Sequence, residues 1–175
     1  MVKSEDGELD MPDYTLEFVD ISGILNFWFY EDEEIYFADG RLLLRGANGA
    51  GKTVTMQSLI PLVLDGDKRP WCLDPFGSKD RKIEYYLLGE GDGAHINRTG
   101  YLYLEFYHPQ HRRYVTIGIG LRARKNARPL FWGFAVTDNR RVGKDFNLFD
   151  TDYEGKRLLS ERAVAGIAWV WRVGG

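Results

Sequence analysis

The feature that most constrains this chain is the stretch at residues 46–53, GANGAGKT, which matches the phosphate-loop pattern G-x-x-x-x-G-K-[ST] at every fixed position. Its glycines allow backbone turns that a side chain would forbid, so that successive N–H groups point inward around a phosphate. Lys52 would contact the β- and γ-phosphate oxygens, and the Thr53 hydroxyl would ligate Mg²⁺. A helix that starts here also directs its positive end at the anion. We therefore predict a nucleotide-binding site.

The residues around this stretch have the order that a phosphate loop requires. Residues 41–45, RLLLR, are a short apolar run typical of a buried strand, and residues 54–64 have a helical pattern. Gln57 and Ser58 are predicted to face solvent. Pro61 is expected to kink or end the helix. Four apolar side chains of the helix are predicted to face the core: Val54, Leu59, Ile60 and Val63.

The composition is typical of a folded protein with a sizeable core. Hydrophobic residues make up 44% of the 175 residues, charged residues 28% and aromatic residues 14%, which argues against disorder and favours a β-rich interior. No apolar run approaches the ~20 residues of a membrane helix, and the acidic start is unlike a signal peptide. The single cysteine, Cys72, cannot form an internal disulfide. We predict a cytoplasmic protein with no membrane partner.

We divide the chain into three parts. Residues 1–13 are polar and acidic and are predicted to lack fixed structure. Residues 14–159 contain the glycine loop and most of the β-forming residues, and are predicted to form the nucleotide-binding unit. Residues 160–175 are atypical, because a uniformly apolar run without an amphipathic period ends in two glycines. We interpret this tail either as a final buried strand or as a truncated or aberrant end.

The rest of the pattern predicts mainly antiparallel strands. Gly23 is predicted to separate two strands, and an Asp-Gly turn at residues 39–40 to join a strand at 33–37 to the run at 41–45. A short helix is expected at residues 80–88. Beyond residue 100, alternation with a period of two and the turn residues between the runs predict further strands at residues 101–107, 114–124, 131–137 and 140–149.

Positive charge is concentrated in residues 112–144, where nine Lys and Arg residues accompany Asp138 as the only acid. Alternation along strands would place several of these side chains on one solvated face, which would suit DNA. The alternative is that they only keep an exposed sheet soluble. The candidate DNA contacts are Arg112, Arg113, Arg122, Arg124, Lys125, Arg140 and Arg141. The three histidines, His95, His108 and His111, lack metal-ligand spacing and are predicted to be surface residues.

The loop sequence, with Asn48 and Gly49 before Gly-Lys-Thr, resembles the loop of ATP-binding-cassette ATPases and especially of the SMC, Rad and RecF types. The flanking strings LNFWFY, FADGRLLLRGANGAGKTVTMQSLIPLVLDGD, LDPFGSKDRKIEYYLLGEGDG and TGYLYLEF resemble the N-terminal part of the SMC-like ATPases of Wadjet-type anti-plasmid systems, relatives of MukB and MksB. This resemblance covers residues 25–149. It implies an α/β P-loop NTPase fold, the N-terminal lobe of an ABC/SMC-type ATPase head with a β-rich antiparallel subdomain.

In that family the head is split between two lobes joined by a long coiled coil, and the C-terminal lobe carries the signature motif, the Walker B aspartate and the glutamate base. The present sequence has no signature-like motif, no apolar run ending in Asp-Glu and no heptad stretch. The resemblance therefore implies binding of MgATP with no catalytic residue in this chain. The implied partners are the C-terminal lobe and coiled coil, a second head in a homodimer, kleisin-type subunits and DNA, in plasmid defence or chromosome organisation.

Carried over residue by residue, the resemblance assigns ATP and Mg²⁺ to the loop and the start of the helix. The implied nucleotide-binding residues are Asn48, Gly49, Ala50, Gly51, Lys52, Thr53 and Val54, with Thr53 also the Mg²⁺ ligand. Adenine contacts are expected from the aromatic segment at residues 26–30, although Phe27 and Phe29 would equally suit a core. Neither Gln57 nor Gln110 has the setting expected of a glutamine that senses Mg²⁺.

Two other functions remain open at this stage. A self-contained P-loop kinase or NTPase would need a base and an arginine lid on helices after the loop, whereas strands follow here. A non-enzymatic nucleic-acid-binding module would use the basic strands at 112–144. It would bind DNA in a salt-sensitive way even after Lys52→Ala.

Overall fold

The computed structural model describes residues 18–63, 82–166 and 169–172. The elements in chain order are β1 (Phe18–Phe27), β2 (Tyr30–Tyr36), α1 (Lys52–Val63), α3 (Ile83–Leu88), the 3-10 turn η1 (Gly91–Gly93), β3 (Asn97–His108), β4 (Arg113–Arg124), β5 (Leu130–Val136), β6 (Phe149–Thr151), β7 (Arg157–Leu159) and β8 (Trp169–Arg172). None of the helices in these ranges is both long enough and apolar enough to cross a membrane.

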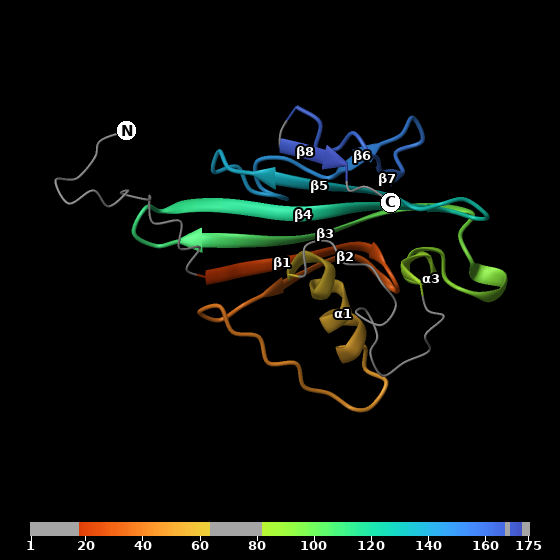
Figure 1. Ribbon diagram of the computed structural model, residues 1–175, viewed down its shortest axis with the longest axis horizontal. Coiled ribbons are helices and arrows are strands. Elements are labelled where there is room, and N and C mark those ends of the chain that lie inside the picture. Colours follow the sequence, from red (N-terminus) through yellow and green to blue (C-terminus); the bar gives the residue numbers. More distant parts are fainter. Residues whose placement is uncertain (1–17, 64–81, 167–168, 173–175) are drawn as a thin grey trace, which may run out of the picture.

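The fold is α/β and is organised around a six-stranded antiparallel sheet in the order β2-β1-β3-β4-β5-β8 (Figure 1). A separate two-stranded sheet pairs β6 with β7. The longest pair is β3–β4, whose register runs from Asn97 opposite Arg124 to His108 opposite Arg113. The antiparallel strands predicted at 101–107, 114–124 and 131–137 are therefore confirmed, each with slightly different ends.

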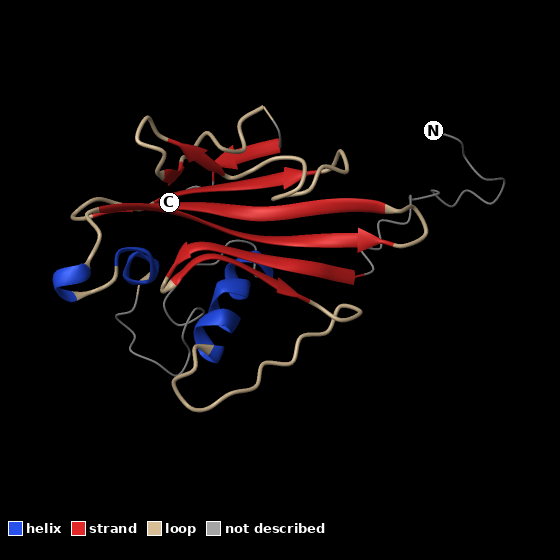
Figure 2. Cartoon of the chain, turned by 180° about the vertical axis from the view of Figure 1, so that it is seen from behind, coloured by secondary structure: helices blue, strands red, loops and turns tan. Residues whose placement is uncertain are grey.

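Both faces of the sheet are apolar, because successive residues of a strand point to opposite sides. In β3, Leu102 joins a core cluster that includes Tyr86 of α3, whereas Tyr101 joins a second cluster that includes Leu148 and Val164. Figure 2 shows the consequence in space: the helices lie on one side of the sheet, and the β6–β7 hairpin lies on the other.

Gly23 does not break the chain into two strands, as the sequence predicted; β1 passes through it without interruption. The ring of Tyr103 on the neighbouring strand lies directly over this glycine, and a Cβ added at Gly23 would lie 2.0 Å from ring atoms. The glycine is required here for the close approach of a large cross-strand side chain, and not for a turn.

The helix predicted after the glycine loop is present as α1, but the predicted orientation of its polar residues is wrong. Gln57 and Ser58 are 4% and 1% exposed, whereas Val63 is 64% exposed. The helix can bury Ser58 because its hydroxyl donates a 2.7 Å hydrogen bond to the Thr55 carbonyl one turn earlier. Pro61 lies within the last turn, and the helix ends at Val63.

The strand predicted at residues 41–45 is wrong, because residues 42–46 have no regular secondary structure. The turn at 39–40 is confirmed, since Asp39 and Gly40 both have positive φ and a single bridge joins their neighbours. No described strand lies beside residues 42–45 to pair with their backbone groups. Leu43 is 79% exposed in this segment.

The C-terminal part differs most from the sequence prediction. The strand predicted at 140–149 is replaced by turns and one isolated bridge, and the short strands β6 and β7 follow it. In the tail, β8 is an edge strand with Trp169 75% exposed, so its described part is not the buried strand considered from the sequence. The predicted helix at 80–88 appears as the shorter α3. The predictions for residues 1–13 and for Cys72 lie outside the described residues.

Candidate nucleotide site

Residues 46–51 form a loop that leads directly into α1, as the sequence predicted. Gly46, Gly49 and Gly51 have φ values of 154°, 84° and 83°, a region that side chains other than glycine rarely adopt. Space is also limited at Gly51, where an added Cβ would lie 3.2 Å from the Tyr30 hydroxyl. The glycines of the motif are thus needed for the backbone path of this loop.

The Lys52 side chain folds back over the loop. Its ammonium donates two hydrogen bonds of 2.7 Å, to the carbonyls of Gly46 and Ala47. An ammonium has three N–H donors, so one remains for another acceptor. In the described part of the chain no carboxylate forms an ion pair with Lys52. A full positive charge is therefore held at the start of α1 by two backbone carbonyls.

Tyr30 connects the sheet to the start of α1. Its hydroxyl lies 2.7 Å from the Thr55 hydroxyl, in hydrogen-bond contact, and Thr55 also donates to the Gly51 carbonyl at 3.2 Å. Because Tyr30 is the first residue of β2, this contact fixes the first turn of the helix to the N-terminal end of that strand. From the sequence, Tyr30 was expected only among the adenine contacts and Thr55 had no predicted role, since a contact across 25 residues leaves no local pattern.

The β1–β2 turn presents aromatic side chains in two different ways. Phe27 is fully buried and stacks on Tyr86, with ring centroids 5.3 Å apart, so Phe27 is a core residue. Phe29, two residues later, is 84% exposed. Trp28 between them has a positive φ of 55°, which is unusual for a bulky residue, and its ring packs against Tyr85. Of the two phenylalanines in the segment, only Phe29 is free to stack on a ligand.

The remaining predicted nucleotide-binding residues lie at the same loop–helix junction. Asn48, Ala50 and Thr53 are exposed, and Val54 packs against the core cluster that contains Leu102 and Tyr86. Within the described ranges, no group of three or more His, Cys, Asp and Glu side chains could hold a metal ion. A hydroxyl such as that of Thr53 fits Mg²⁺ in a site where phosphate oxygens and water supply the other ligands. The residues present therefore suit a metal that arrives with a nucleotide.

The predicted DNA-contacting residues do not form one surface. β4 spans about 36 Å at ~3.3 Å per residue, and the basic residues fall at its two ends. One group lies at or beyond its start and contains Arg112, Arg113, Arg140 and Arg141, and the other lies at its end and contains Arg122, Arg124 and Lys125. Their role in DNA binding stays a prediction.

Several of these arginines are engaged within the protein. Arg141 forms ion pairs with the buried Glu105 and with Asp20, and its guanidinium lies 3.8 Å from the centre of the Tyr114 ring. This arrangement joins three strands and the segment after β5. Other members also have partners: Arg140 pairs with Asp138, Arg113 donates to the Thr137 carbonyl, and Arg122 contacts Glu161 and Asn97.

No protein-family model and no curated protein matches this chain, so its function has to be inferred from the residues and their geometry.

Proposed function

We propose that this chain binds MgATP through residues 46–53, as the N-terminal lobe of an SMC-like, ABC-type ATPase head. The observation that carries this proposal is the position of Lys52. Its ammonium is held by two backbone carbonyls at the start of a helix, beside glycines in turn conformations and without a carboxylate among the described residues. Such a charge, together with backbone N–H groups and a helix N-terminus, attracts a polyphosphate.

In this proposal each group has a distinct role. Loop N–H groups donate to the β-phosphate, and the third N–H of Lys52 reaches the β- and γ-phosphate oxygens. The Thr53 hydroxyl supplies the protein ligand of Mg²⁺, while the metal neutralises phosphate charge. The exposed ring of Phe29 stacks on the adenine, since it adjoins Tyr30, which contacts the first turn of α1.

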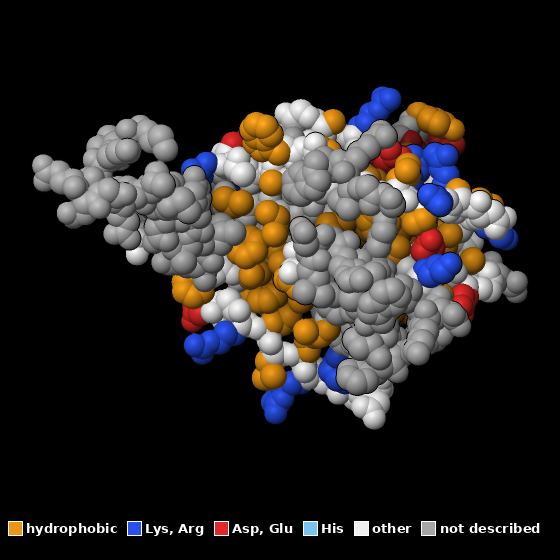
Figure 3. Space-filling model, viewed as in Figure 1, with side chains coloured by type: hydrophobic (Ala, Val, Ile, Leu, Met, Phe, Trp, Pro, Cys, Tyr) orange, Lys and Arg blue, Asp and Glu red, His pale blue; other side chains and the backbone are white. Residues whose placement is uncertain are grey.

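Hydrolysis in this proposal requires a second lobe. Phosphoryl transfer needs a positioned water and charges from several parts of a site, and this chain supplies only the phosphate loop. The run at residues 42–45 supports the requirement for a second lobe, because Leu43 is 79% exposed and no described strand pairs with the run. Hydrophobic side chains also gather over β1 and around α1 on the face shown in Figure 3.

The complete assembly would contain that C-terminal lobe with its coiled coil, a second head and kleisin-type subunits, and would handle DNA in plasmid defence or chromosome organisation. In such an assembly ATP joins two heads and its hydrolysis separates them.

The proposal is tested by calorimetric titration of this chain with ATP in the presence of Mg²⁺, with phosphate release followed on the same samples. We expect binding without turnover. Lys52→Ala should weaken binding at least tenfold, because a charge-assisted contact to phosphate contributes about 1.5–3 kcal/mol.

The matched control is Lys144→Ala, which removes an exposed lysine far along the chain from the loop and should leave ATP affinity unchanged. Equal affinities of the wild type and Lys52→Ala would contradict the proposed site. Steady turnover by the chain alone would instead favour a self-contained NTPase.

A further inference from the structure

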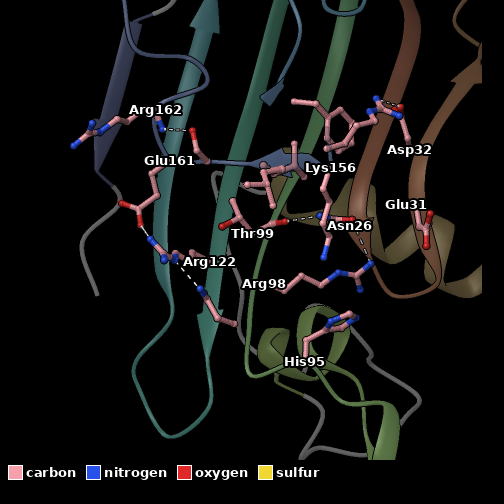
Figure 4. A pocket seen from close by; sticks show the side chains of 16 residues that line it. Asn26, Glu31, Asp32, His95, Arg98, Thr99, Arg122, Lys156, Glu161 and Arg162 are labelled. Carbon is pink, nitrogen blue, oxygen red and sulfur yellow. Dashed lines mark hydrogen bonds and ion pairs between the residues drawn. The ribbon is translucent and has the colours of Figure 1, made fainter. Parts of the chain in front are cut away.

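A second candidate site lies at one end of the main sheet. A pocket of about 820 Å³ opens between the starts of β2 and β3, the end of β4 and the β6–β7 hairpin (Figure 4). None of its lining residues belongs to the glycine loop at 46–53 or to α1. The pocket is therefore separate from the proposed ATP site.

The charged side chains that line this pocket are predominantly basic. Two ion pairs cross it, from Arg122 to Glu161 and from Arg157 to Asp32. Outside these pairs, three basic residues and a single acid remain, and Arg162 points away from the others in Figure 4. Apart from Arg162, the charged lining residues that form no ion pair within the described part of the chain are Arg98, Lys156 and Glu31.

Arg98 is half-buried, and its hydrogen-bond partners among the described residues are all neutral groups. Its Nη1 donates to the carbonyls of Trp28 and Leu87 at 3.0 and 3.3 Å, and its Nη2 donates to Oδ1 of Asn26 at 3.3 Å. Burial lowers the pKa of Arg98, and the nearby charge of Glu31 opposes this shift. A guanidinium has five N–H donors, so two remain beyond the three contacts that hold it in place.

A partly buried cation without a paired anion is costly to keep in a fold. The cost is removed when an anion with several acceptor oxygens enters the pocket and meets both Arg98 and the flexible ammonium of Lys156. Phosphate suits this arrangement, because a guanidinium fork matches its oxygens and an ammonium adds a point charge. A phosphomonoester carries about −1.5 to −2 at neutral pH, which balances the two cations.

We propose that this pocket binds a phosphomonoester group, with Arg98 and Lys156 as its charged ligands. Two kinds of ligand carry such a group: a small phosphorylated metabolite and the 5′-phosphate end of a nucleic acid. The site is independent of ATP binding at the glycine loop. It uses residues from β3 and from the β6–β7 hairpin, which the sequence places 58 positions apart.

The test uses the whole chain carrying Lys52→Ala, so that the glycine loop does not contribute phosphate binding of its own. Four probes are titrated: ribose 5-phosphate, ribose, a 5′-phosphorylated oligonucleotide and the same oligonucleotide with a 5′-hydroxyl. The variant Lys156→Gln removes the charge of an exposed residue in the turn of the β6–β7 hairpin. Its matched control is Arg128→Gln, an exposed arginine just beyond the end of β4 that neither lines the pocket nor belongs to the candidate DNA contacts.

We expect a phosphorylated probe to bind at least tenfold more tightly than its hydroxyl counterpart, with ribose as the counterpart of ribose 5-phosphate. Lys156→Gln should weaken that binding about tenfold and Arg128→Gln less than twofold. Tighter binding of the phosphorylated oligonucleotide than of ribose 5-phosphate identifies a nucleic-acid end, and the reverse identifies a small metabolite. The proposal is overturned if the phosphate adds no affinity, or if both substitutions have the same effect.

Discussion

At the scale of single residues, Tyr30 and Lys52 together position the glycine loop. Lys52 closes over the loop through the carbonyls of Gly46 and Ala47, and Tyr30 holds the following turn of α1 through Thr55. The role of Lys52 is apparent from the motif. The role of Tyr30 depends on where a strand end meets a helix, which only the folded chain determines.

Tyr30→Phe removes one hydroxyl and leaves the aromatic packing in place. We expect a loss of about 1 kcal/mol in the free energy of unfolding, because the Thr55 hydroxyl loses one partner but keeps the Gly51 carbonyl. ATP affinity should fall several-fold, since the loop becomes less ordered. Urea denaturation and calorimetry measure the two effects.

The control for this prediction is Tyr153→Phe, at a tyrosine that is 95% exposed. It should change neither stability nor ATP affinity. If Tyr30→Phe behaves like this control, the hydroxyl contact does not support the loop.

At the scale of elements, large side chains of one strand lie over glycines of the next. Tyr103 covers Gly23, and Trp132 covers Gly120, where an added Cβ would lie 1.9 Å from the indole. These contacts allow the long strands of the sheet to carry aromatic residues on the face opposite the helices. A glycine within a β-forming run is therefore ambiguous in the sequence, because the residue that requires it lies on another strand.

Gly23→Ala tests this packing directly. The added methyl group meets the buried ring of Tyr103, and we expect a loss of about 1–3 kcal/mol in the free energy of unfolding. Gly93→Ala, where nothing lies within 4 Å of an added Cβ, should change stability by less than about 0.5 kcal/mol.

A double-mutant cycle with Tyr103→Ala identifies the cause of this loss. The cost of Gly23→Ala should largely disappear once the ring is removed. An unchanged cost in that background would show that the backbone, and not the ring, requires the glycine.

At the scale of the whole molecule, the sequence predicts local features well and partner-dependent features poorly. The helix after the glycine loop and the period-two strands on either side of Arg113 follow from local patterns, and the structure confirms them. The run at 41–45 has the composition of a buried strand, but a strand forms only beside a partner, and no described strand lies there. The predicted orientation of α1, with Ser58 facing solvent, is also wrong, because a local hydrogen bond satisfies the buried Ser58 hydroxyl.

The candidate sites follow the same division. The glycine loop could be predicted because all its functional groups lie within eight consecutive residues. The pocket around Arg98 could not, since its charged residues come from four strands, the β6–β7 turn and the segment after β7, and no spacing in the sequence relates them. Strand alternation in the basic segment at 112–144 would allow several of its side chains to share one face, whereas the structure places the candidate DNA contacts at opposite ends of β4.

The central claim is that residues 46–53 bind the triphosphate of ATP. The most direct measurement is a titration of the isotopically labelled chain with MgATP, following backbone amide resonances by NMR. We predict the largest chemical-shift changes at the amides of residues 48–53, with smaller changes at Phe29, and none of this pattern in Lys52→Ala. Unchanged loop amides, or changes confined to the pocket around Arg98, would contradict the claim.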